Sequence, residues 1–246
     1  MISFAPALGM WLLLAPAQAG ATTASPAVHT VKLKAEDGAI LEGDEWVPSE
    51  AGRAEAGILL LHGYGASRKA WGDFPATLAR AGYRVLAIDI RGHGGSSSVA
   101  GLAGNPERLE DDPALAPNDL RAGLAWLRAA PGADPSRLGV IGAGLGGDLA
   151  CVASGLGLAR SAVALSPNRD HAHLLAGHRQ LHMQALLLIA TSGDPGRESQ
   201  SRRLFLEARQ PKDVHVLTGS GEDGEAILAA RPEAIGMILD WLHRTL

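Results

Sequence analysis

The 246-residue sequence is poor in cysteine, in aromatic side chains and in net charge. Its single cysteine excludes an intramolecular disulfide framework and a cysteine-based zinc site. A formal net charge of -4 provides no general attraction for nucleic acid, so we expect no nucleic-acid partner. Aromatic residues make up only 4% of the chain, but 46% of its residues are hydrophobic, which is typical of a protein with a sizeable core. The length suits one domain or two small ones.

The N-terminal segment has no charged side chain between residues 2 and 19 and ends in Ala17-Gln18-Ala19. This pattern of small residues fits a signal-peptidase site, so we expect a signal peptide over residues 1–19 that is cleaved after Ala19. The protein would then be exported, to a periplasm or to the medium. An uncleaved membrane anchor is the alternative, because the apolar stretch is almost long enough to span a bilayer. Two prolines interrupt that stretch and favour the signal peptide.

After cleavage, residues 20–27 form a flexible lead-in and residues 28–246 form a single α/β domain. Residues 28–33 alternate between apolar and polar side chains, and Asp37-Gly38 is a turn signal before a second strand over residues 40–47. These features predict an antiparallel hairpin at the edge of a sheet.

The rest of the domain alternates between short apolar runs and helical patterns. The runs lack polar alternation, which is typical of strands buried on both faces of a mainly parallel sheet. They cover residues 57–61, 85–88, 138–141, 162–165, 185–190 and 214–217. Apolar residues at helical spacing lie between and after them, namely Trp71, Phe74 and Leu78; Leu120, Leu124 and Leu127; and Ile235, Ile238, Leu239 and Leu242. This order predicts a doubly wound sheet with its ligand site at the carboxyl ends of the strands.

Three loops at those strand ends carry recognisable motifs. The first is His62-Gly63-Tyr64-Gly65, the second is D-x-R-G-H-G-x-S over residues 89–96, and the third is G-x-G-x-G over residues 142–146. Together they resemble the oxyanion loop, the second loop and the nucleophile elbow of the α/β-hydrolase superfamily. The resemblance covers nearly the whole mature chain. Because the spacing leaves no room for a large cap domain, the chain looks like the compact dienelactone-hydrolase and serine-aminopeptidase type.

The resemblance also implies where a catalytic triad should lie. The elbow presents a serine nucleophile in such enzymes, but this chain has Gly144 at that position. The acid is expected after the strand at residues 185–190, where Asp194 is found. The histidine is expected after the last strand, where Asp223 stands, or Glu222 if the loop is one residue longer.

The nucleophile and its general base are therefore both missing. The resemblance implies that the backbone N–H groups of Tyr64 and Leu145 form an oxyanion hole, which alone supports little catalysis. Losing the nucleophile costs a factor of about 10⁶ in turnover in subtilisin. We therefore predict a catalytically impaired pseudoenzyme that acts as a binding or scaffold protein for a small molecule or peptide. With Asp194, Asp223 and Glu222 near one another, the pocket between the Tyr64 loop and the Gly144 elbow should be acidic and prefer neutral or cationic ligands.

An active ester or peptide hydrolase with a non-standard nucleophile is the main alternative. Cys151 is the first candidate, although its place two turns into a helix favours a buried core residue. Asp148 fits a first-turn acid that the helix N-terminus stabilises. His93 and Ser96 fit residues that shape the second loop.

A metal site is a further alternative, because histidines are concentrated after the strand at residues 162–165. If residues 174–181 are helical, two of these histidines share one helix face. The favoured interpretation is a solvated, histidine-rich connection, and we expect no metal or cofactor. The candidate ligands are His171, His173, His178 and His182, with Asp170 beside them.

Nucleotide binding is the last alternative. Gly142, Gly144 and Gly147 fit the G-x-G-x-x-G pattern between a strand and a helix. No acidic residue follows at the distance where a dinucleotide site binds a ribose hydroxyl, around residues 162–166. The pattern is therefore better explained by the elbow.

Overall fold

A computed structural model describes residues 26–49, 55–96, 115–177 and 179–246 of the chain. The predicted signal peptide and its cleavage site, and most of the predicted lead-in, lie outside these residues. The first strand begins at Ala27, the last residue assigned to the lead-in. No helix among the described residues is long and apolar enough to cross a membrane.

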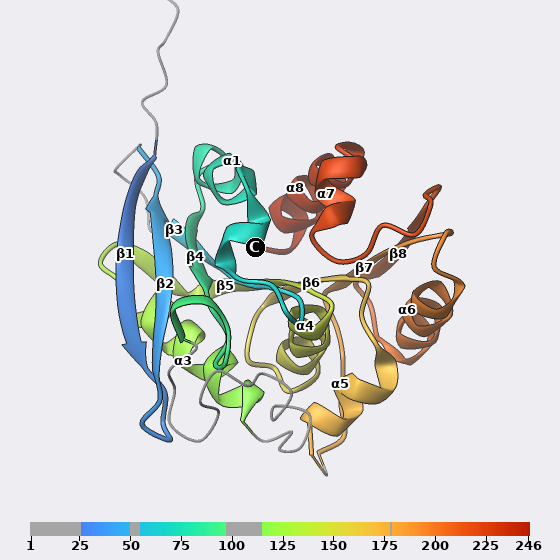
Figure 1. The fold of residues 1–246 in the computed structure, drawn as a ribbon, viewed down its shortest axis with the longest axis horizontal. Helices are drawn as coiled ribbons and strands as arrows, with labels where there is room; N and C mark the ends of the chain where they lie inside the picture. Colours follow the sequence, from blue (N-terminus) through green and yellow to red (C-terminus); the bar gives the residue numbers. More distant parts are fainter. Residues whose placement is uncertain (1–25, 50–54, 97–114, 178) are drawn as a thin grey trace, which may run out of the picture.

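Eight strands form one sheet in the order β1-β2-β4-β3-β5-β6-β7-β8 (Figure 1). The predicted hairpin is confirmed, because β1 pairs with β2 in antiparallel register and lies at the sheet edge. Strand β2 is also antiparallel to β4, and every later pairing is parallel. The strands are β1 (Ala27–Lys34), β2 (Ile40–Val47), β3 (Glu55–Leu61), β4 (Arg84–Ile88), β5 (Ala133–Ala143), β6 (Ser161–Leu165), β7 (Leu186–Thr191) and β8 (Lys212–Leu217).

Helices cover both faces of the sheet, as predicted for an α/β-hydrolase fold without a large cap. Helices α1, α7 and α8 lie on one face, and α3 and α4 lie on the other (Figure 1). The helical segments are η1 (Arg68–Trp71), α1 (Phe74–Arg80), η2 (Gly94–Ser96), α3 (Ala116–Ala129), α4 (Leu145–Gly155), α5 (Arg169–Leu175), α6 (Pro195–Glu207), α7 (Ala226–Ala230) and α8 (Glu233–Thr245).

The core consists of two layers that share the central strands. In β3, Ile58 and Leu60 pack into the layer beneath α1 and α8, whereas Leu59 and Leu61 pack into the layer with α3 and α4. Both sets are fully buried, because each side of the strand faces a helix layer. This explains why the apolar runs show no polar alternation.

One predicted helix is divided in two. Trp71, Phe74 and Leu78 are all buried, as their spacing suggested, but Trp71 ends the short η1 turn and α1 begins at Phe74. Gly72 separates the two segments with φ +54°, a left-handed conformation that an α-helix does not contain.

The strand order brings the site loops together. Strand β3 lies between β4 and β5, so the loops that follow these three strands meet at one edge of the sheet. From β3 the chain continues to β4 on one side of it and then to β5 on its other side. The strand order therefore reverses at β3 and β5, and ligands bind above such a switch point in sheets of this kind.

Buried ion pairs hold the loop after β4 in place. The Asp89 carboxylate accepts from the Arg68 guanidinium, from the Arg68 backbone N–H and from the Gly95 N–H. Arg91 donates to the fully buried Asp119 of α3 through Nε and Nη2, at 2.8 and 2.6 Å. These charge-assisted bonds fix the loop against both η1 and α3.

Candidate functional site

A sharp strand–turn–helix bend follows β5, where the sequence predicts the nucleophile elbow. Strand β5 ends at Ala143, Gly144 has φ +51° and ψ -114°, and α4 begins at Leu145. The side chain of residue 144 would be presented above the strand ends. Because the residue is glycine, this position has no nucleophilic atom.

The glycines on either side of position 144 are needed for close packing. A Cβ atom on Gly142 would lie 1.8 Å from the Gly146 carbonyl oxygen, and one on Gly146 would lie 1.9 Å from the Leu61 carbonyl oxygen. At Gly144 itself the nearest contact of an added Cβ is the Gly63 Cα at 3.5 Å. The elbow therefore has room for a side chain at position 144.

The loop after β3 lies against the elbow and is held by two histidines. His62 Nε2 accepts from the Ile90 N–H at 2.9 Å, so its Nδ1 carries the hydrogen and donates to the Gly63 carbonyl oxygen at 2.7 Å. Burial lowers the pKa of His62 to about 4, which keeps the ring neutral. His93 Nε2 accepts from the Gly65 N–H at 3.0 Å, and its Nδ1 donates to the Arg91 carbonyl oxygen.

These bonds assign both histidines a structural role. Each ring uses one nitrogen as acceptor and the other as donor toward the backbone, so neither has a nitrogen left to take a proton from a substrate. The interpretation of His93 as a loop-positioning residue is confirmed. Ser96 is likewise buried, and its hydroxyl accepts from the Glu42 N–H at 2.9 Å.

The two remaining predicted triad positions are occupied by residues with other contacts. Asp194 is the N-cap of α6, and its Oδ1 accepts from the Arg197 N–H at 3.0 Å. Asp223 has a side chain that is 45% exposed, and its Oδ2 lies 4.0 Å from Arg197 Nε. The residue packed against the elbow is Gly224, where an added Cβ would lie 3.5 Å from the Ala143 Cβ.

Glu225, a residue that the sequence motifs do not predict, connects the loop after β8 to the loop after β3. Its Oε1 accepts from the Gly63 N–H at 2.7 Å. Burial raises the pKa of the Glu225 carboxyl, and the bond from Gly63 opposes that rise. The only local signal for this contact in the sequence is that Glu225 is an acidic residue two positions after the expected histidine position.

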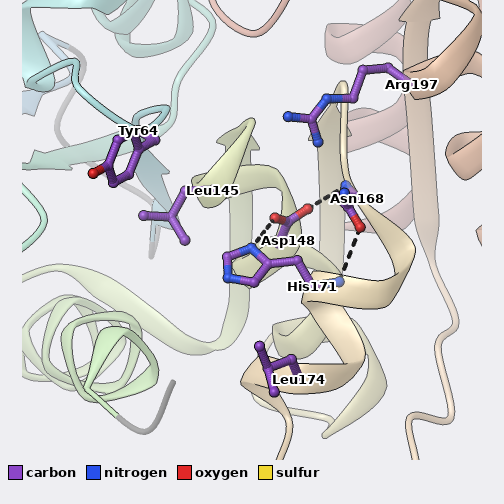
Figure 2. Close-up of a pocket in the computed structure, with 7 residues that line it drawn as sticks. All are labelled: Tyr64, Leu145, Asp148, Asn168, His171, Leu174 and Arg197. Atoms are coloured by element: carbon purple, nitrogen blue, oxygen red, sulfur yellow. Dashed lines mark hydrogen bonds and ion pairs between the residues drawn. The ribbon is translucent and has the colours of Figure 1, made fainter. Parts of the chain in front are cut away.

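A cavity of about 440 Å³ opens beside the elbow (Figure 2). Tyr64 and Leu145, the two predicted oxyanion-hole residues, lie on one side of it. As the first residue of α4, Leu145 has an N–H without a partner inside the helix. The other described lining residues are Asp148, Asn168, His171, Leu174 and Arg197.

This lining corrects the expected character of the pocket. Asp194, Asp223 and Glu222 are not among the described lining residues. Asp194 caps α6, Asp223 is partly exposed, and the Glu222 carboxylate accepts from the Ser220 N–H. The cavity is instead lined by one carboxylate, Asp148, and one guanidinium, that of Arg197. The prediction of an acidic pocket around Asp194 and Asp223 is therefore wrong.

An Asp–His pair forms the polar wall of the cavity. Asp148 is 2% exposed, and its Oδ2 lies 2.7 Å from His171 Nδ1. Its Oδ1 accepts from the backbone N–H of Asn168, whose own side chain caps α5 by accepting from the His171 N–H. Burial raises the pKa of the Asp148 carboxyl, while the hydrogen bond from His171 opposes that rise. The interpretation of Asp148 as a simple first-turn acid missed this contact between α4 and α5.

The predicted histidine cluster does not come together. His171 contacts Asp148, but His173 Nε2 lies 2.9 Å from Glu207, and His182 is exposed. The condition for the shared helix face is not met among the described residues of 174–181, since α5 ends at Leu175. The side chain of His178 lies outside the described residues. Within the described part of the chain, no group of three or more potential ligands is placed to bind a metal ion.

Two further alternatives lose support. Cys151 is fully buried in the core, as expected, and burial raises the pKa of its thiol well above the ordinary value, which disfavours the reactive thiolate. At the glycine-rich turn, the buried Asp148 carboxylate lies in the first turn of α4, where a bound pyrophosphate would place like charge. The geometry therefore does not favour a nucleotide site.

Comparisons with known proteins agree with the fold. The family model described as "Alpha/beta hydrolase family" matches residues 58–243. An uncharacterized protein of Mycobacterium tuberculosis is 28% identical in an alignment of 249 positions, which covers 92% of this chain and 82% of that protein.

Two solved structures illustrate the structural similarity. The dienelactone hydrolase from Anabaena variabilis aligns with a TM-score of 0.72 and 20% identity, covering 91% of this chain and all of that one. The acetyl xylan esterase from Paenibacillus sp. R4 aligns with a TM-score of 0.69 and 19% identity, covering 88% and 84% of the two chains. Similarity at this level of identity establishes the fold alone.

Proposed function

This chain belongs to the α/β-hydrolase family, and we propose that it is a member that binds a small ligand without serine-hydrolase chemistry. The observation that carries the proposal is Gly144, which occupies the nucleophile position in an elbow with a sharp bend and room for a side chain. The reaction of a serine hydrolase begins with attack by the side chain at this position. Without that side chain, no acyl-enzyme can form there.

The surroundings of the elbow support the same proposal. Asp194 caps a helix, and Asp223, which stands where the resemblance expects the histidine base, is an aspartate that lies partly in solvent. His62 and His93 are engaged with the backbone through both ring nitrogens. The cavity nevertheless has a volume within the range of small-molecule sites, about 300–1,000 Å³.

A panel of ester and peptide substrates tests the proposal on the purified protein. We expect no turnover above that of a mock preparation. The double variant Gly144→Ser with Asp223→His, which restores the two missing residue types, is the matched comparison and should gain esterase activity. Robust turnover by the wild type that persists in Cys151→Ala would contradict the proposal.

A hydrolase with a non-standard nucleophile is the second candidate, and the Asp148–His171 pair favours it. An imidazole held by a buried carboxylate is the arrangement of a general base, which could activate a water molecule directly. Turnover that is lost in His171→Gln but retained in His173→Gln would support this candidate over the binding protein.

We also propose that the protein is exported through a signal peptide over residues 1–19. The support is the uncharged apolar segment that ends in Ala17-Gln18-Ala19. Mass spectrometry of the mature protein from its native host should find an N-terminus at Gly20. Detection of the intact N-terminus in a membrane fraction would contradict the proposal and support an anchor.

A further inference from the structure

The guanidinium of Arg197 faces the site without a hydrogen bond to any carboxylate among the described residues. Arg68 and Arg91 each donate from three nitrogens of the guanidinium to acidic side chains. Among the described residues, the carboxylate nearest to the Arg197 guanidinium is that of Asp223, at 4.0 Å from Nε. The Arg197 side chain extends into the cavity from the start of α6 (Figure 2).

His171 presents a second polar group to the same cavity. Its Nδ1 is occupied by Asp148, and no described residue forms a hydrogen bond with its Nε2. The Asp148 bond fixes the orientation of the ring, because the carboxylate itself is held by the Asn168 N–H. In the protonated ring, Nε2 is a second donor.

The rest of the lining is largely apolar. Leu145 lies across the cavity from His171, and Leu174 lies below it (Figure 2). Leu174 is 51% exposed and Tyr64 is 44% exposed, so both leave apolar surface at the cavity that a ligand could cover. The site thus combines a guanidinium and an imidazole nitrogen with walls suited to an apolar body.

We propose that the cavity binds a small monocarboxylate with an apolar body, whose carboxylate is held by Arg197 and His171. This inference rests on the proposed binding function and names the ligand class. The planar guanidinium matches a carboxylate in two parallel hydrogen bonds. Two protein carboxylates face Arg197 and His171, and neither occupies the proposed position of the ligand carboxylate. Asp148 already accepts from His171 and Asn168, and Asp223 lies beyond hydrogen-bonding distance of Arg197.

Isothermal titration with three isosteric probes tests the ligand class. The probes are 4-phenylbutyrate, its neutral amide and 4-phenylbutylamine, each titrated into the full-length mature protein. We expect 4-phenylbutyrate to bind with a Kd on the order of 1 mM or tighter, and the amide and amine to bind at least tenfold more weakly.

Variants locate the bound carboxylate. Arg197→Gln and His171→Gln should each weaken 4-phenylbutyrate binding at least tenfold, since the first removes the guanidinium and the second removes the imidazole that face the bound carboxylate. Arg202→Gln on the same helix and His173→Gln on α5 are the matched controls and should bind like the wild type, because neither residue is a lining residue. Circular dichroism melts of all four variants confirm that they are folded.

Two results would overturn the inference: equal affinity for the carboxylate, amide and amine, or unchanged carboxylate binding in a folded Arg197→Gln. Both differ from failure of the proposed function, which is seen as ester or peptide turnover. If the protein neither turns over esters nor discriminates between the three probes, the proposed function stands and the proposed ligand class is wrong.

Discussion

Close packing requires a glycine at positions 142 and 146 but not at position 144. At positions 142 and 146 any side chain would collide with backbone oxygen atoms at less than 2 Å. At position 144 the space is open, and the only local demand is the backbone conformation with φ +51° and ψ -114°, which costs an L-residue about 1–3 kcal/mol. Packing therefore does not explain why the nucleophile position lacks a side chain.

Alanine substitutions should separate these two situations. Gly144→Ala should lower the free energy of unfolding by about 1–3 kcal/mol, because only the backbone conformation is unfavourable. Gly142→Ala should lower it by more than about 4 kcal/mol or prevent folding, because the helix start must move. Urea denaturation monitored by circular dichroism measures both. Equal losses at the two positions would contradict this account of the elbow.

His62 makes the stability of the oxyanion loop dependent on pH. Its pKa is lowered from 6.5 to about 4, so the unfolded chain binds the proton more readily than the folded protein between these values. Stability contributed by the neutral ring is therefore complete above pH 6.5 and falls as the pH drops toward 4, by about 3 kcal/mol in total.

The free energy of unfolding at pH 7.5, 6.5, 5.5 and 4.5 tests this prediction. The decline over this range should be about 2.5 kcal/mol smaller in His62→Gln than in the wild type. His29→Gln changes an exposed histidine of β1 and should leave the decline unchanged. A His62→Gln profile parallel to that of the wild type would refute the assignment.

At the scale of elements, Glu225 joins the loop after β8 to the loop after β3. Glu225→Gln keeps an oxygen acceptor for the Gly63 N–H and removes a buried charge, whereas Glu225→Ala removes the acceptor. Because the pKa of Glu225 is raised in the folded protein, ionisation of this carboxyl is less favourable there than in the unfolded chain. The contribution of Glu225 to stability therefore falls as the pH rises through the raised pKa.

Glu225→Gln should therefore be at least as stable as the wild type at pH 7.5, and Glu225→Ala should be less stable by about 1–3 kcal/mol. Thermal and urea unfolding compare the two, with the exposed Glu36→Gln as the control for a simple loss of charge. A strongly destabilised Glu225→Gln would show that the carboxylate's charge, and not its hydrogen bond, holds the two loops together.

The elements that the sequence predicted well are those with a strong local pattern. The hairpin over β1 and β2 follows from alternation and a turn signal, and the elbow follows from glycines at backbone contacts. The Asp148–His171 pair could not be predicted in this way, because it depends on how α5 packs against the first turn of α4, 23 residues away in the chain. The acidic-pocket prediction failed for the same reason, since the caps and exposure of Asp194 and Asp223 depend on neighbouring loops.

At the scale of the whole molecule, the fold and its cavity do not depend on the residues that carry out catalysis in serine hydrolases. The sheet order, the two helix layers and the buried loop networks match an α/β-hydrolase, and they build a cavity at the switch point of the sheet. None of these features requires a nucleophile. A chain that keeps the scaffold and replaces the reacting residues can retain ligand binding while losing covalent catalysis.

Labelling with a fluorophosphonate probe tests this account most directly, because the probe reacts covalently with activated serine nucleophiles. Intact-protein mass spectrometry of the purified wild type after incubation with excess probe should show no added mass. A stoichiometric adduct on the folded protein, with its site identified by peptide mapping, would contradict the claim that this chain lacks a serine-hydrolase nucleophile.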